Sequence, residues 1–539
     1  MKRFLVISTV LLLSLSCLLF AEVRGTEYGA VNGTTEGEAL VWFSVPYGKV
    51  PAGDLRWQAP EAPEPWDGIY DATERKPVAM QLSSGSIIGT EDCLNVDIYA
   101  PADAEGLPVL VYIHGGNNQT GTTRELIGSE LAVADDIIFV SVNYRLGPLG
   151  FNCLPALQTE PGSTGNYALL DIAYALDWVK RNIASFGGDP DNITISGFSA
   201  GGRDVMALLI SPLFEGKFQK AISFSGGMTT ADVTLSARKI AKAIAPLAVE
   251  DGAAETEEAA VEWLLGTGED VRDYLYSISS ERLSALMGSA GIRMSVFPHL
   301  YEDGVALPVG GFDAAVYNEV PLIMLTGTTE FSMFASGPSN YAAMTDFTAE
   351  EVAQAKAFAI KYGSKMYGYF NAEDSAERMY DSYNAPVYLC VINYGDPSSE
   401  YQVQPLGAFH GIFIPMLSSV NNYSSMSDFG APGYSDLSAK FRLYLKNFLY
   451  TGDPNGEGLA DWAEWEPSTH LSMLLDAAND EAVTVSTSLS TSYDQIMDEM
   501  DADTSCSAEV KAAAIRYVMN GRWFSSALDE RYGNPDLWQ

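Results

Sequence analysis

Histidine is rare in this sequence, with four residues among 539: His114, His299, His410 and His470. No group of cysteines and histidines has the close spacing of a metal site. The sequence therefore predicts no metal centre. Any chemistry that needs an imidazole has only these four candidates.

Basic residues are also in short supply. The chain has 31 lysines and arginines against 70 aspartates and glutamates, for a formal net charge of -39. Binding to nucleic acid needs basic patches that meet the phosphates, so nucleic acid is excluded as a partner class. An anionic membrane surface repels such a chain for the same reason. The charge favours solubility over recruitment of a cationic substrate.

Long apolar runs are absent beyond the N-terminus, so no later segment is expected to span a bilayer. The N-terminal run, residues 4–20, follows two basic residues and precedes a polar stretch, as in a secretory signal peptide. Cleavage is expected after Ala21 or Gly25. Apolar residues continue past Cys17, which argues against a lipoprotein site, and an uncleaved anchor is the remaining alternative. We expect a secreted or periplasmic protein, without a lipid anchor and without stable membrane insertion after cleavage.

Cysteine is rare as well, with five residues. Cys17 leaves with the signal peptide, so the mature chain keeps Cys93, Cys153, Cys390 and Cys506. An oxidising compartment permits disulfides, and four cysteines allow three pairings. The sequence does not choose among them.

Buried strands and amphipathic helices alternate along the chain. Continuous apolar runs predict strands covered on both faces at 107–113 and 137–142. Further strands are expected at 221–225, 321–326 and 386–392. Helical periodicity is found at 168–184, 348–370 and 435–449. This alternation predicts an α/β fold with a mostly parallel central sheet and helices on both faces.

Residues 229–300 have a different composition, acidic and rich in alanine, with helices expected over 255–265 and 270–286. They predict a helical insertion over the active-site end of the sheet. The Ser/Thr-rich residues 484–492 are expected to form a loop, and the tail from 507 a short helix.

The chemistry centres on residues 197–201, Gly-Phe-Ser-Ala-Gly. A β-branched run at 193–195 precedes them and an apolar helical pattern at 205–210 follows. Strand, tight turn and helix form the context in which G-x-S-x-G is a nucleophile elbow, with Ser199 exposed on a strained turn. Glycine and serine are common, so chance occurrence is the alternative for the motif taken alone.

An activated serine needs a base and a carboxylate that orients the base. In α/β-hydrolases these follow the serine in the order acid, then histidine. His114 belongs to a glycine loop, and His299 precedes any plausible acid strand. His470 lies in a polar C-terminal segment, whereas His410 sits beside Gly411 after the strand at 386–392. His410 is therefore the expected base.

The acid is expected after the strand at 321–326, where Glu330 lies. Asp303 and Asp396 are the competing carboxylates. The oxyanion donors are expected to be backbone N–H groups, from Ala200 and from the glycine loop at 115–117.

Several further motifs carry a family resemblance from about residue 29 to about residue 480. The matching segments are 43–47 with 55–57, 91–96, 143–147, 186–192, 297–298 with 303–304, 451–455 and Trp462. With these strings the chain resembles the type B carboxylesterases, the cholinesterase-like branch of the α/β-hydrolases. The resemblance implies an α/β-hydrolase fold, Ser199 as nucleophile, His410 as general base and acid, and Glu330 as orienting carboxylate. It also implies an oxyanion hole of the Gly116, Asn117 and Ala200 N–H groups and no metal or organic cofactor, and it argues against Asp303 as the acid.

The sequence departs from the family pattern at four places. Phe198 replaces the usual glutamate before the nucleophile, and residues 117–119 make the oxyanion loop more polar than usual. The spacer before Glu330 is two residues shorter than usual, and Cys93 lacks its usual upstream partner. The polar loop bears on the substrate preference, and the shorter spacer bears on the assignment of Glu330 as the catalytic acid residue.

The sequence thus predicts a signal peptide at 1–25, a carboxylesterase domain at 26–482 and a C-terminal extension at 483–539 that packs on it or trails it. The expected function is a secreted serine hydrolase that cleaves small carboxylic esters through an acyl-enzyme. One alternative is a catalytically weak or inactive binding or adhesion protein on this fold. The other is an amide or thioester hydrolase with the same machinery.

Overall fold

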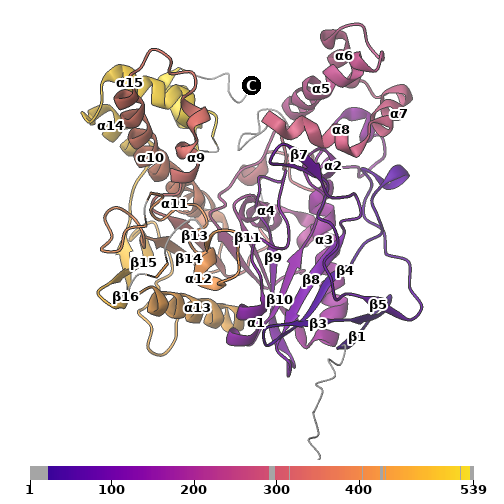
Figure 1. The fold of residues 1–539 in the computed structure, drawn as a ribbon, viewed down its shortest axis with the longest axis horizontal. Coiled ribbons are helices and arrows are strands. Elements are labelled where there is room, and N and C mark those ends of the chain that lie inside the picture. Colours follow the sequence, from indigo (N-terminus) through magenta and orange to yellow (C-terminus); the bar gives the residue numbers. More distant parts are fainter. Residues whose placement is uncertain are drawn as a thin grey trace, which may run out of the picture.

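The computed structural model describes residues 22–289, 298–314, 316–403, 405–424, 429–430, 433–522 and 524–533 (Figure 1). The apolar run of the expected signal peptide and Phe297 lie outside the described residues. Within the described part, no helix combines the length and apolar character needed to cross a membrane.

A sheet of 11 described strands forms the centre of the molecule, in the spatial order β16-β15-β14-β13-β12-β11-β9-β10-β8-β4-β3. Neighbouring strands are parallel from β10 to β15 in this order and antiparallel towards both edges. The strands are β3 (Thr34–Glu36), β4 (Ala39–Pro46), β8 (Asn95–Ala100), β9 (Leu107–Ile113), β10 (Ile138–Val142), β11 (Gly188–Phe198), β12 (Lys220–Phe224), β13 (Leu322–Gly327), β14 (Val387–Ile392), β15 (Leu471–Ala478) and β16 (Glu481–Ser488). The predicted α/β-hydrolase architecture is confirmed.

Smaller sheets lie beside it. One contains β1 (Val23–Thr26), β2 (Gly29–Asn32) and β5 (Ile69–Asp71), and the other contains β6 (Gln81–Ser83) and β7 (Ser86–Ile88).

Both faces of the central sheet are buried, as β9 illustrates. Val109, Val111 and Ile113 belong to one apolar cluster, and Leu110 and Tyr112 belong to another. Alternate residues of a strand point to opposite faces, so this unbroken apolar run fills two cores at once. The first cluster includes apolar residues of α3 (Tyr167–Asn182) and α4 (Ala200–Ile210), the second those of α1 (Ser129–Asp135), α12 (Ile414–Leu417) and α13 (Tyr434–Thr451). The short α2 (Gly147–Gly150) is also buried.

The region 229–300 contains the expected helical insertion. Its helices are α5 (Val233–Glu250), α6 (Glu257–Leu264), α7 (Glu269–Ser277) and α8 (Ser280–Ala285), at the upper right of Figure 1. The single helix expected over 270–286 is wrong, because α7 ends and α8 begins within it. Ser279 has extended backbone angles, and its hydroxyl accepts the N–H of Arg282 at 3.3 Å, which caps the new helix.

A second helical group lies at the upper left of Figure 1 and includes the C-terminal region. It comprises α9 (Ser332–Ser336), α10 (Ala349–Asn371), α14 (Tyr493–Ala502), α15 (Ala508–Ala514) and α16 (Ser526–Tyr532), which share a third apolar cluster. The helix α11 (Glu373–Met379) follows α10.

The loop expected over 484–492 is wrong for its first half, because β16 extends to Ser488 and pairs antiparallel with β15. Val483, Thr484, Val485 and Thr487 are β-branched and suit a strand, and the tight turn before them has Asn479 at a φ of 54°. The domain boundary expected at 482 falls inside this strand.

The cysteines of the described part, Cys93, Cys153, Cys390 and Cys506, are all free thiols. The first three are buried, and burial raises the pKa of each of these thiols.

Candidate active site

Ser199 occupies a strained turn between β11 and α4. Its φ is 56° and its ψ is -112°, a conformation that is costly for a residue with a side chain. A methyl group at Gly197 would lie 2.2 Å from the Gly201 oxygen, and one at Gly201 would lie 2.0 Å from the Ile113 oxygen. Only glycine fits on either side, so the motif is fixed by close backbone packing.

Glu330 and His410 are in direct contact. His410 Nδ1 lies 2.5 Å from Glu330 Oε2. The other oxygen, Oε1, accepts the Gly327 N–H at 2.7 Å, the Ser225 hydroxyl at 2.5 Å and the Thr326 hydroxyl at 3.2 Å. Glu330 is completely buried, and these donors compensate for the water that its carboxylate loses.

Aromatic rings surround the His410 imidazole. The ring centroids lie 4.6 Å from Phe198, 5.1 Å from Phe334 and 5.5 Å from Tyr367. The His410 Nε2 atom has no hydrogen-bond partner among the described residues. His410 and Ser199 line the same pocket of about 460 Å³. With Nδ1 held by Glu330, Nε2 is the nitrogen available for proton transfer.

The loop after β9 is built from residues with left-handed backbone. Gly116, Asn117 and Asn118 have φ values of 98°, 58° and 56°. A methyl group at Gly116 would lie 2.2 Å from the Thr120 oxygen. Gly116 and Asn117 line the pocket, and Ala200 is the first residue of α4, so its N–H belongs to the helix N-terminus.

Side chains hold this loop from below. Arg203 Nη2 donates to Asn117 Oδ1 at 3.0 Å, and Asn118 Nδ2 donates to Asp204 Oδ1 at 2.7 Å. Tyr144 donates its hydroxyl proton to Asn118 Oδ1 at 3.1 Å. The polar residues 117–118, unusual in sequence, are therefore anchored to the first turn of the elbow helix.

A buried carboxylate also holds the start of the loop. Glu125 Oε2 accepts the Gly115 N–H at 2.8 Å and the Tyr112 hydroxyl at 2.9 Å. Burial raises the pKa of Glu125 to about 7, and burial likewise raises the pKa of Asp204 to about 7. Burial lowers the pKa of His114 to about 4, so this loop histidine is neutral at neutral pH.

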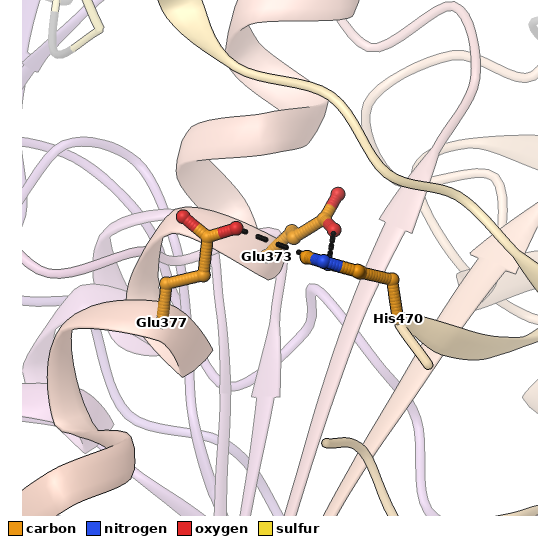
Figure 2. A group of neighbouring side chains, drawn as sticks. All are labelled: Glu373, Glu377 and His470. Carbon is orange, nitrogen blue, oxygen red and sulfur yellow. Dashed lines mark hydrogen bonds and ion pairs between the residues drawn. The ribbon is translucent and has the colours of Figure 1, made fainter. Parts of the chain in front are cut away.

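His299 and His470 do not line the pocket of Ser199. His299 is buried with its ring 5.5 Å from Phe151, and burial lowers its pKa. Figure 2 shows His470 against α11, with Nδ1 2.7 Å from Glu373 Oε1 and 3.9 Å from Glu377 Oε1. Among the described residues, these three form the one group of His, Cys, Asp or Glu side chains whose possible ligand atoms are close enough to hold a metal ion, all within 4.8 Å of one another. These contacts make the group a polar link between α11 and the residue that precedes β15.

The competing carboxylates have other partners. Asp303 Oδ2 accepts the amide of Asn166 at 2.9 Å, and Asp396 Oδ2 accepts the hydroxyl of Thr328 at 2.7 Å. Neither has a described hydrogen bond to His410. Each serves instead to fix a loop.

Sequence reasoning missed Ser225, Arg203 and Glu125. Ser225 directly follows β12, whose carboxyl end lies beside that of β13 in the parallel sheet, and this position was a usable signal. Arg203 lies one helical turn after Ser199, a second usable signal. Nothing in the sequence around Glu125 indicates its contact with Gly115.

A serine elbow at the carboxyl edge of a mostly parallel sheet, with a histidine and a buried carboxylate beside it, is the arrangement of an α/β-hydrolase. The chain belongs to the carboxylesterase family, whose family model matches residues 20–357, and it is a carboxylic ester hydrolase.

Among its relatives is the para-nitrobenzyl esterase of Bacillus subtilis, 30% identical over 495 residues that cover 85% of this chain and 95% of that protein. Another is carboxylesterase 1E of Mus musculus, 31% identical over 505 residues, or 82% of this chain and 86% of that protein. A solved PNB esterase structure matches with a TM-score of 0.68 at 27% identity, over 86% of this chain and 97% of that chain.

Proposed function

We propose that this protein is a secreted serine carboxylesterase that works through an acyl-enzyme, with Ser199 as nucleophile, His410 as base and Glu330 as orienting carboxylate. One observation carries the proposal. His410 is held by Glu330 through Nδ1, while Nε2 is unpartnered among the described residues in the pocket that Ser199 lines. This is the arrangement that lets an imidazole accept a serine proton.

The reaction begins when the Ser199 hydroxyl attacks the ester carbonyl and its proton moves to His410 Nε2. The imidazolium keeps its Nδ1–H directed at the Glu330 carboxylate, which stabilises the new positive charge. The N–H groups of Gly116, Asn117 and Ala200 bind the oxyanion. Nε2 then protonates the leaving alcohol, and an acyl-enzyme remains on Ser199.

Water releases the acid in the second half of the reaction. It enters the place that the alcohol has left, gives a proton to His410 Nε2 and attacks the acyl carbonyl. The tetrahedral intermediate then collapses, the bond to the Ser199 oxygen breaks, and His410 Nε2 returns the proton to that oxygen. The rings of Phe198, Phe334 and Tyr367 limit rotation of the imidazole, so the same nitrogen serves both half-reactions. The pocket volume of about 460 Å³ suits small ester substrates.

The test compares the parent protein with Ser199→Ala on a panel of 4-nitrophenyl esters, with a fluorophosphonate probe as a label for the activated serine. We expect turnover and labelling in the parent, and a loss of roughly a million-fold in Ser199→Ala. The exposed serine variant Ser339→Ala is the matched control and keeps parental turnover. Folded parent protein that neither turns over nor reacts with the probe contradicts the proposal.

Secretion is part of the proposal, with cleavage after Ala21. Glu22 is needed in the mature protein, because its carbonyl accepts the Gly33 N–H at 3.0 Å and the Trp42 indole N–H at 2.8 Å. Cleavage after Gly25 would remove most of β1 as well. The N-terminal sequence of the exported protein is expected to begin at Glu22, and a start at Thr26 contradicts this assignment.

A further inference from the structure

A buried arginine lies in the wall of the catalytic pocket. Arg203 is 1% exposed and stands four residues after Ser199, with its N–H donating to the Ser199 carbonyl at 3.0 Å. Residues four apart share one side of a helix, so the guanidinium is on the serine side of α4. Arg203 lines the pocket together with Ser199, Asn117 and Tyr367.

Arg203 is the one lysine or arginine among the described residues that line the pocket. No acidic residue is found among the described residues that line the pocket. The neighbouring Asp204 accepts the Asn118 amide and does not line the pocket; burial raises its pKa to about 7, while Asn118 and Arg203 act to lower it. A guanidinium has several N–H donors in a planar fork that matches a carboxylate. Asn117 Oδ1 accepts from Nη2, and the Tyr367 hydroxyl also interacts with the guanidinium.

A second donor lies in the same wall. Gln119 lines the pocket and is 7% exposed, and its Nε2 has no hydrogen-bond partner among the described residues. A buried amide N–H that lacks an acceptor is costly, so a ligand oxygen at this position is favoured. Arg203 and Gln119 thus supply charge and hydrogen bonds from two different elements, α4 and the loop after β9.

We infer that Arg203 and Gln119 form a subsite for a carboxylate on the acyl part of the substrate. The preferred substrates are then half-esters of dicarboxylic acids, with the ester carbonyl at Ser199 and the free carboxylate at Arg203. The acyl side is indicated because Arg203 supports Asn117, whose N–H is assigned to the carbonyl oxygen. The inference rests on the proposed function and narrows its substrate class.

The test uses two 4-nitrophenyl esters that differ in charge and little in shape. One is the mono-4-nitrophenyl ester of adipic acid, and the other is 4-nitrophenyl 6-methylheptanoate, in which an isopropyl group replaces the carboxylate. The measured quantity is the ratio of kcat/KM for the anionic ester to kcat/KM for the neutral ester, after subtraction of the Ser199→Ala rate. The variants are Arg203→Gln, Arg203→Lys and, as a surface control, Arg238→Gln.

We expect the parent to favour the anionic ester about tenfold or more. Arg203→Gln should lower the ratio about 10- to 100-fold, as expected when a hydrogen bond to a charged group is lost. Arg203→Lys keeps the charge without the fork and should lie between the two. Arg238 is exposed on α5 and pairs with Glu262, so its variant changes the net charge equally and should keep the parental ratio.

A parental ratio at or below one overturns the subsite whatever the variants do, even if Arg203→Gln fails to fold. An unchanged ratio in folded Arg203→Gln overturns it as well. Hydrolysis of the neutral ester with no preference for the anionic one leaves the serine esterase standing and removes only the carboxylate subsite. Hydrolysis of neither ester by folded parent overturns both.

Discussion

Replacing Glu330 by glutamine tests the orienting role of this carboxylate with a minimal change in shape. The Oε1 position faces the donors of Ser225, Thr326 and the Gly327 backbone, so the amide oxygen must take it. The amide NH2 then faces His410 Nδ1 at the place of Oε2. Two N–H groups cannot face each other there. The imidazole must switch tautomer and carry its proton on Nε2.

An imidazole with a proton on Nε2 cannot accept the proton of Ser199. The carboxylate that stabilises the imidazolium is also lost. Together these effects reduce kcat by about 10³- to 10⁴-fold, or about 4–5.5 kcal/mol of transition-state stabilisation. KM should change little, because Glu330 itself does not line the pocket and reaches it only through His410.

The assay is steady-state hydrolysis of 4-nitrophenyl butyrate by the parent and Glu330→Gln, with circular dichroism to confirm the fold. Ser225→Ala removes one hydrogen-bond donor to Glu330 and should lower kcat roughly tenfold, the effect expected for one hydrogen bond to a charged group. Asp303→Asn and Asp396→Asn are the matched carboxylate controls and should stay within a few-fold of the parent. Glu330→Gln activity within tenfold of the parent, or a large loss in Asp396→Asn, would refute the reasoning.

Two further predictions concern stability. Gly201→Ala places a methyl group 2.0 Å from the Ile113 oxygen and should lower the free energy of unfolding by about 3 kcal/mol or more. In Gly368→Ala, within α10, the atom nearest to the new methyl group lies 3.6 Å away, so this variant should raise the free energy of unfolding by up to about 1 kcal/mol. Equal melting temperatures for the two variants contradict this. Burial raises the pKa of Glu125 in the folded protein from 4.5 to about 7. Ionisation of Glu125 therefore lowers the free energy of unfolding as pH rises above 4.5, and this destabilisation is complete above pH 7. Relative to the parent, the free energy of unfolding of Glu125→Gln should rise by about 2–3 kcal/mol between pH 5 and pH 8. Urea unfolding at both pH values checks this, and a difference that does not change with pH is the contrary result.

The sequence predicted those parts of the fold that depend on local pattern. The unbroken apolar run from Leu107 to Ile113 predicts a strand that is buried on both faces, and in the structure it is β9 in the centre of the sheet. The polarity of the serines and threonines at 484–488 favours a loop, whereas the β-branched side chains of Thr484, Val485 and Thr487 suit an edge strand. The break between α7 and α8 was missed because the apolar spacing continues across it, while Ser279 carries the only local signal, a helix cap.

The support of the candidate site was less accessible from sequence. Glu330 and His410 are 80 residues apart, and their order along the chain was sufficient to pair them as candidates. Glu125 contacts the loop after β9 only because the chain folds back beneath it, and no spacing rule encodes that. Phe331 likewise shows its packing partners only in three dimensions, since they come from residues almost 200 positions later.

The contact between Phe331 and Phe524 links the loop that contains Glu330 to the C-terminal helical region. Phe331 directly follows Glu330, is completely buried and packs edge-on against Phe524 at 5.3 Å, with the Arg522 guanidinium 5.4 Å from its ring. During synthesis the serine elbow therefore leaves the ribosome long before the residues that seat Glu330. Loss of the segment that contains Arg522 and Phe524 is therefore expected to lower esterase activity, although neither residue lines the pocket of Ser199.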